Sequence, residues 1–142
     1  MITIKEIEND ITQEFVQLNT IDEKYIHLFK LGQSLPDMDP SFKTEAYQVK
    51  GCQSTVWFHI TSEDGCMHLE ADSDSMVIKG ISALLMRLVK DRQPDEVLNI
   101  NLDFLDNFGI WKLASQQNPG LTAILEHIHR HAKDKMPILP LR

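Results

Sequence analysis

Two alternating segments on either side of a short turn constrain the fold of this chain most strongly. In residues 54–61 and 66–73, apolar side chains alternate with polar ones, which is the pattern of half-buried β-strands. The sequence between them, SEDG, is typical of a four-residue turn. The two segments therefore predict an antiparallel β-hairpin.

The register of this hairpin follows from its apolar residues. If Thr61 pairs with Cys66, apolar side chains lie opposite one another on one face. The apolar pairs are then Val56–Ala71, Phe58–Leu69 and Ile60–Met67, and the pairs on the other face are Thr55–Asp72, Trp57–Glu70 and His59–His68. We expect helices to cover the apolar face and the other face to be a solvated mixture. Residues 47–50 are expected to add a short preceding strand.

Helical patterns flank the hairpin. Apolar spacings of three and four predict a first helix that begins near Thr3, with Thr3 and Glu6 as a capping box. A second helix is expected to begin after Asp22 as its N-cap and to end before Pro36. The largely apolar residues 76–89 predict a central, buried helix, with cap candidates in residues 72–75. Short helices near residues 94–96 and 103–105 and a last helix from near Pro119 complete the chain.

This order of elements predicts an α+β fold in which helices pack on one face of a small antiparallel sheet. The sequence has 142 residues, a length that suits one domain, and it contains no internal repeat or shift of composition. We therefore expect a single domain over residues 1–142.

Charge and hydropathy exclude two classes of partner. The net charge is −7 and no basic stripe is present, which argues against nucleic-acid binding. Charged residues interrupt the apolar N-terminal residues, and no run approaches the roughly 20 apolar residues that a membrane span needs. We expect a cytoplasmic protein, in which the two cysteines are reduced thiols.

Cys52 is the candidate nucleophile. The predicted register places it level with Ser75, beside the first turn of the helix over residues 76–89, where backbone amides and the helix dipole favour a thiolate. Lys50 acts in the same direction, whereas the carboxylates of Asp72 and Asp74 oppose it. The direction of the pKa shift therefore stays open. A buried core thiol is the alternative to an accessible nucleophile.

Cys66 is expected to be a bystander. In the predicted register it lies at the turn end of the hairpin, roughly 30 Å from Cys52 at about 3.3 Å per residue. A disulfide between the two cysteines would be out of reach at that distance.

Several short motifs resemble the SufE family of cysteine-desulfuration proteins. They are GCQS at 51–54, VW at 56–57, DSD at 72–74 and IKG at 78–80, supported by KY at 24–25, LGQSLP at 31–36 and PGL at 119–121. The motifs follow the family's order along most of the chain.

The resemblance implies a sulfur-transfer role for Cys52. In similar proteins, this cysteine accepts a sulfane sulfur from a SufS-type cysteine desulfurase, carries it as a persulfide and passes it to an iron-sulfur scaffold. Pyridoxal phosphate belongs to the partner, so no cofactor or metal and no independent turnover are expected here. Gly51, Gln53 and Ser54 are expected to shape the loop, and Asp74 to lie near the thiol. The implied fold is related to that of the IscU-like iron-sulfur scaffold proteins.

One segment departs from the family pattern. The family typically carries a stretch resembling HLSPSRSNGL, whereas residues 112–121 read KLASQQNPGL. Lys112 therefore replaces a histidine and Gln117 replaces an arginine. The arginine would provide a charged hydrogen bond that glutamine lacks. Lys112 is either a substitute for that charge or an ordinary surface lysine.

Two other classes of function remain as alternatives. A free-standing thiol redox enzyme would need a resolving thiol or a C-x-x-C motif, and the sequence has neither. A metal or iron-sulfur scaffold would need more thiolates than two distant cysteines supply. His127 and His131 are one helical turn apart, but a solvated helix explains them better than a metal site.

Overall fold

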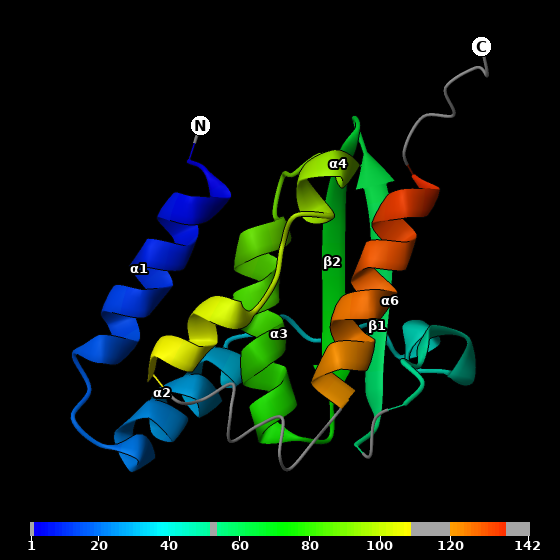
Figure 1. The fold of residues 1–142 in the computed structure, drawn as a ribbon. Helices are drawn as coiled ribbons and strands as arrows, with labels where there is room; N and C mark the ends of the chain where they lie inside the picture. The colour runs from blue at the N-terminus through cyan, green and yellow to red at the C-terminus, as the bar shows by residue number, and fades with distance from the viewer. Residues whose placement is uncertain (1, 52–53, 109–119, 136–142) are drawn as a thin grey trace.

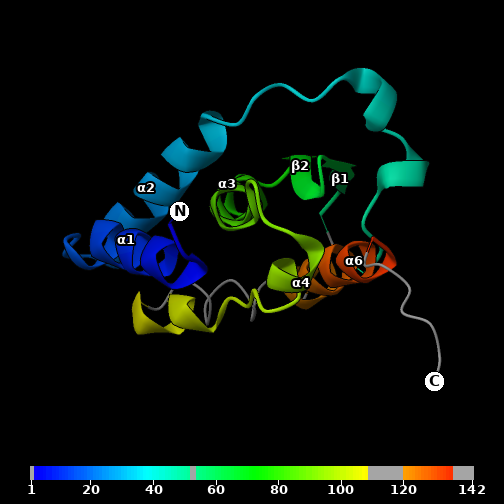
Figure 2. The same cartoon turned by 90° about the horizontal axis from the view of Figure 1, so that it is seen from above.

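A two-stranded antiparallel sheet lies near the centre of the molecule, with helices against one of its faces (Figures 1 and 2). The computed structural model describes residues 2–51, 54–108 and 120–135. Their elements, in order, are α1 (Ile4–Val16), α2 (Ile21–Gln33), the 3-10 helices η1 (Pro40–Phe42) and η2 (Glu45–Tyr47), β1 (Val56–Glu63), β2 (Cys66–Ser73), α3 (Met76–Val89), α4 (Pro94–Val97), η3 (Asp103–Phe108) and α6 (Gly120–Asp134). The α+β class is confirmed. No helix of these residues is long and apolar enough to cross a membrane.

The hairpin turn is shorter than its sequence suggests. Glu63 pairs with Cys66, and the turn consists of Asp64 and Gly65 alone. Both turn residues have positive φ, 54° and 79°, which is the backbone of a type I′ turn and is favoured by an Asp-Gly sequence. The predicted four-residue turn, with Thr61 opposite Cys66, is therefore wrong by two residues.

The assignment of faces is nevertheless correct. A shift of two residues preserves the alternation of side chains, so each strand keeps its apolar face. The pairs on that face are Val56–Ser73, Phe58–Ala71 and Ile60–Leu69. Figure 2 shows α3 and α6 on the same side of the sheet, α3 beside β2 and α6 beside β1.

The outer face of the sheet is not the solvated mixture that the sequence predicts. The ring of His59 stacks on Phe42 with 3.7 Å between centroids, and Lys43 lies over the ring of Trp57. Lys43 also forms a 2.8 Å ion pair with Asp72. The segment that contains η1 and η2 therefore covers part of this face. The strand predicted over residues 47–50 is reduced to one antiparallel bridge, between Gln48 and Trp57.

Side-chain caps fix where the helices begin. Thr3 caps α1 by accepting a hydrogen bond from the Glu6 amide at 3.1 Å, as predicted. Ser75 caps α3 in the same way. The prediction for α2 is wrong, because Thr20 rather than Asp22 is its cap and the helix begins two residues earlier.

α3 is the central helix, and α2 crosses it at very short range. Gly80 of α3 is the closest point: a Cβ atom there would lie 2.4 Å from the Leu28 carbonyl oxygen and 2.5 Å from Leu28 Cγ. A Cβ on Gly32 would lie 2.9 Å from the Gly80 nitrogen. Gly32 lies within α2, which continues through it to Gln33. Its lack of a side chain is what allows the two helices to approach.

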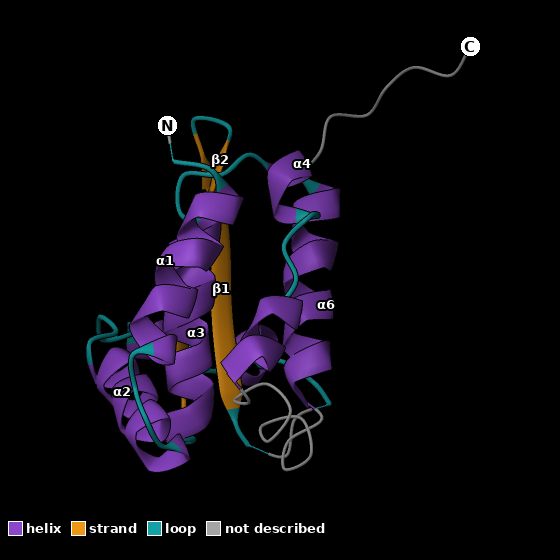
Figure 3. Ribbon diagram, turned by 60° about the vertical axis from the view of Figure 1, so that its left-hand side comes forward, coloured by secondary structure: helices purple, strands orange, loops and turns teal. Residues whose placement is uncertain are grey.

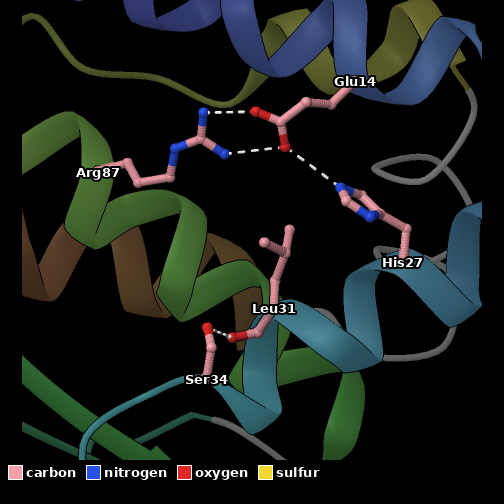
Figure 4. A network of polar contacts seen from close by, with 5 residues as sticks. All are labelled: Glu14, His27, Leu31, Ser34 and Arg87. Carbon is pink, nitrogen blue, oxygen red and sulfur yellow. Dashed lines mark hydrogen bonds and ion pairs between the residues drawn. The ribbon is translucent and has the colours of Figure 1, made fainter.

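One carboxylate joins three of the four long helices that the structure describes, α1, α2 and α3. Glu14 of α1 receives two hydrogen bonds from Arg87 of α3, at 2.6 and 3.1 Å, and lies 3.2 Å from His27 of α2 (Figure 4). Burial raises the pKa of Glu14, but the hydrogen bonds from Arg87 and His27 outweigh it and lower the pKa overall. Figure 3 shows α1 and α2 on one side of α3 and α6 on the other.

The close α2–α3 contact predicts that Gly80→Ala destabilises the protein. Although alanine favours helix formation, the added methyl group overlaps Leu28, and such overpacking costs about 2–3 kcal/mol. Urea unfolding measures the change. Gly65→Ala is the control, because no atom lies within 4 Å of its Cβ position and only its positive φ costs about 1 kcal/mol. A Gly80→Ala protein as stable as wild type contradicts the packing.

Candidate functional site

The segment that carries the candidate nucleophile is a six-residue loop with closed ends. The Val49 N–H donates to the Val56 carbonyl at 2.8 Å, so residues 50–55 leave and return at neighbouring points. Val49 and Val56 are both buried in the core. Cys52 and Gln53 lie within this loop but outside the described residues, so the predicted position of Cys52 level with Ser75 lies outside them as well. What the structure describes is how the loop is held.

Three hydrogen bonds fix Thr55 at the downstream end of the loop. Its N–H donates to Asp74 Oδ1 at 3.1 Å. Its carbonyl accepts from Ser73 Oγ at 2.7 Å and from the Asp74 N–H at 3.2 Å. Thr55 thus lies beside the junction between β2 and α3, opposite Asp74 instead of Asp72 because of the corrected register.

The upstream end of the loop lies against α6. Gly51 has a φ of +93°, a conformation that side chains rarely adopt. A Cβ atom on it would lie 3.3 Å from the Cβ of Ala123. Gly51 therefore allows both the turn of the backbone and its close approach to α6.

The other predicted site residues gather at the same end of the sheet. Ser54 is half-buried between the undescribed pair 52–53 and the anchored Thr55. Asp74 is exposed, and its carboxylate holds the loop. Asp72 is a separate case: burial raises its pKa, but hydrogen bonds and ion pairs, chiefly with Lys43, outweigh burial and lower the pKa. Its charge is therefore compensated locally.

A small cavity opens beside the loop, between residues 48–50 and α6. Its volume is about 170 Å³, and its lining residues are Gln48, Val49, Lys50, Ala123, Glu126, His127 and Arg130. Burial, with the charges of His131 and Arg130, lowers the pKa of His127 to about 4, so this ring is neutral at physiological pH. In the part of the chain that the structure describes, the fixed charges lining the cavity are those of Lys50, Arg130 and Glu126.

The histidines of α6 point to different neighbours. The ring of His127 meets Phe58 edge-on, and its centroid is 4.7 Å from that of His131. His129 Nε2 lies 2.8 Å from the Ile100 carbonyl. Within the described ranges, no three histidine, cysteine or acidic side chains are grouped so that they could hold a metal ion.

Cys66 is half-buried and has no disulfide partner among the described residues. It lies beside the hairpin turn, as predicted, at the far end of the sheet from Thr55. Lys112 and Gln117, where the chain departs from the family pattern, lie outside the described residues.

Comparison with known families identifies the family of this chain. The sequence model of the family described as "SufE: Fe-S metabolism associated domain" matches residues 9–132. The chain belongs to the SufE family. The match includes the Cys52 loop, the hairpin, α3 and nearly all of α6.

Relatives agree with this assignment. An uncharacterized SufE-like protein of Rhizobium meliloti is 30% identical over 91% of this chain and 96% of its own length. A SufE-like protein 1 of Arabidopsis thaliana, described as chloroplastic/mitochondrial, is 34% identical over 87% of this chain, which spans only 34% of that longer protein. The solution structure of a hypothetical protein from Thermus thermophilus superposes with a TM-score of 0.72 at 19% identity, covering 91% of this chain and 95% of that one. That likeness supports the fold.

Sequence reasoning missed the loop's principal anchors. The sequence predicts Thr55 only as a strand residue and Ser73 only as a strand residue or a candidate helix cap. In the structure, the hydrogen bond between them helps to fix the loop over residues 50–55. Arg130 was not considered at all. The spacing of Ala123, His127 and Arg130 along a helix gives a local indication that they share one face.

The anchor at Thr55 predicts that Asp74→Ala loosens the loop. Without the carboxylate, the Thr55 amide loses its acceptor, and its hydrogen exchange is expected to rise about fivefold, the equivalent of roughly 1 kcal/mol. Amide exchange by NMR measures this. Asp74→Asn retains an acceptor oxygen and is expected to exchange much as wild type. Equal exchange in all three proteins would show that the side chain does not hold the loop.

The low pKa of His127 predicts a loss of stability in acid. Because its pKa falls from 6.5 to about 4 on folding, the unfolded chain takes up the proton first as the pH drops. The contribution of the neutral His127 ring to the free energy of unfolding is therefore complete above pH 6.5 and is lost as the pH falls towards 4. Allowing for solvent screening, we expect this contribution to be about 1 kcal/mol.

Urea unfolding at about pH 7 and about pH 4.5 tests this. Between these two pH values, the free energy of unfolding of His127→Gln should fall by about 1 kcal/mol less than that of wild type. His68→Gln, which replaces a side chain 40% exposed on the outer face, should behave as wild type. A His127→Gln protein with the wild-type pH dependence would contradict the expectation.

Proposed function

We propose that this SufE-family protein accepts a sulfur atom on Cys52 from the persulfide of a cysteine desulfurase and carries it towards iron-sulfur cluster assembly. Family membership places the chain in iron-sulfur metabolism. The observation that most supports the finer proposal is the loop over residues 50–55, which contains Cys52 and is hydrogen-bonded at both ends. Both ends of the segment that carries this thiol are therefore held in place.

The transfer needs one thiolate and no redox partner. The Cys52 thiolate attacks the outer sulfur of the donor's persulfide, and a new S–S bond forms as the donor's S–S bond breaks. The donor cysteine leaves as a thiolate, which can take up the proton that Cys52 released. Sulfur changes carrier without net oxidation, so a resolving cysteine has no part in the step.

The anchors suit this chemistry because they fix both ends of the loop. Thr55 is tied to residues 73–74, and Gly51 lies against α6. A partner can therefore meet this loop with β1 and α3 already in place. Preorganisation of this kind lowers the entropic cost of bringing two sulfur atoms together.

The partners and cofactors follow from this chemistry. The donor is a SufS-type desulfurase that holds pyridoxal phosphate, and the protein itself uses only the transient persulfide on Cys52. The receiver is an iron-sulfur scaffold. By removing the persulfide that blocks the next turnover, the protein would stimulate the desulfurase without cleaving a carbon-sulfur bond. We place this activity in the cytoplasm.

Intact-mass spectrometry with a purified SufS-type desulfurase and cysteine tests the proposal. Wild type should gain one sulfur atom, and alanine release by the desulfurase should accelerate. Cys52→Ser should abolish both effects. Cys66→Ser is the matched control and should retain them, because Cys66 lies beside the hairpin turn at the other end of the sheet.

Three results would contradict the proposal. A wild-type protein that neither gains mass nor stimulates the desulfurase does not act as its acceptor. If Cys66→Ser loses transfer, the reaction needs a second thiol, which favours a redox mechanism. Binding of iron with new visible absorption, in place of sulfur transfer, would favour a scaffold.

A further inference from the structure

The cavity beside the Cys52 loop is the right size for one side chain of another protein. Its volume of about 170 Å³ equals the space of roughly five or six water molecules. Pockets that take whole cofactors or drug-sized ligands usually measure about 300–1,000 Å³. A single protruding carboxylate, amide or hydroxyl side chain fits a space of this size.

The charges around the cavity favour an acidic side chain. Arg130 has no ion-pair partner among the described residues, although Glu126 lies one turn before it on α6. Lys50 has only a loose pair with Glu45, 3.6 Å long, in which both side chains are mostly exposed. Such a pair costs little to exchange for another. Among the described residues, the lining thus offers two available cations against the one carboxylate of Glu126, in a chain whose net charge is −7.

The cavity is continuous with the loop that carries the nucleophile. Lys50 precedes Gly51 in the chain, and Gly51 lies against Ala123, which also lines the cavity. A protein that brings a persulfide to the loop must therefore cover or adjoin the cavity. Gln48 and the neutral ring of His127 add polar groups to its wall without adding charge.

We propose that this cavity receives an aspartate or glutamate side chain of the sulfur-donating desulfurase, and that Lys50 and Arg130 determine specificity for that donor. This inference rests on the proposed function. The two cations orient the donor through charge-assisted hydrogen bonds to its carboxylate and speed the encounter. Under this inference, their effect falls on the assembly of the two proteins and not on the transfer step.

The test measures desulfurase turnover as a function of the concentration of this protein. The double variant Lys50→Glu/Arg130→Glu should raise the KM for the acceptor about tenfold and leave kcat unchanged. High salt should weaken wild-type binding and have less effect on the variant. The control is Lys133→Glu/Lys135→Glu, which changes the net charge equally on exposed residues of the same helical region that do not line the cavity.

Each outcome decides the inference. A large rise in KM for the cavity variant alone supports it. Equal changes in both double variants show a general charge effect and overturn it. A fall in kcat with an unchanged KM shows action on the transfer step and also overturns it. If wild type itself receives no sulfur, the proposed function fails. If wild type receives sulfur and the cavity variant has the wild-type KM, only this inference fails.

Discussion

The close contact between α2 and α3 determines where the rest of the molecule can lie. Gly80 allows the α2 backbone to approach α3 to a distance that no side chain would permit. Glu14 then joins α1, α2 and α3 through Arg87 and His27 (Figure 4). With α3 held on that side, its opposite side packs against the hairpin, and its N-terminal cap lies next to the end of β2. The junction at residues 73–75 is thus held in place mostly by the packing of α3 against α2 and α1, away from the junction itself.

The loop over residues 50–55, the candidate site, depends on that junction. Ser73 and Asp74 hold Thr55 by hydrogen bonds at the downstream end of the loop. At the upstream end, the N–H of the core residue Val49 donates to the Val56 carbonyl and closes the loop. The loop over residues 50–55 is therefore short, and hydrogen-bonded backbone bounds it on both sides. This arrangement suits the proposed transfer of one sulfur atom from a donor to a receiver. Charge is supplied beside the loop, by Lys50 and Arg130, and Asp74 is used as a structural acceptor.

Sequence patterns predicted which helices and strands form better than they predicted the register of the hairpin or the residue at which α2 begins. Alternation identified both strands and the correct buried face, because the face depends only on the parity of each position. The register was wrong since two types of turn fit SEDG, and the left-handed preference of Asp64-Gly65 decides between them in the folded chain. The start of α2 was misplaced for a similar reason, as Thr20 and Asp22 are both good caps.

The candidate site could be predicted in part. Short motifs predict a role for Cys52 and its neighbours Gly51, Gln53 and Ser54, which stays a prediction. The motifs also include the glycines of the α2–α3 contact, within LGQSLP and IKG. No local pattern indicates that residues 48–50 lie against α6, because more than seventy positions separate them and only the fold brings them together. The outer face of the sheet was misjudged on the same ground, since its cover comes from the distant segment around Lys43.

Native-state hydrogen exchange of two amides tests the central claim that both ends of the loop are fixed. The Val49 amide donates to Val56 and the Thr55 amide donates to Asp74, so both should be strongly protected. Protection should be the same whether Cys52 is a free thiol or carries an added sulfur. Exchange of either amide at the rate of an unfolded peptide, or loss of protection when sulfur is loaded, would contradict a loop held at its ends.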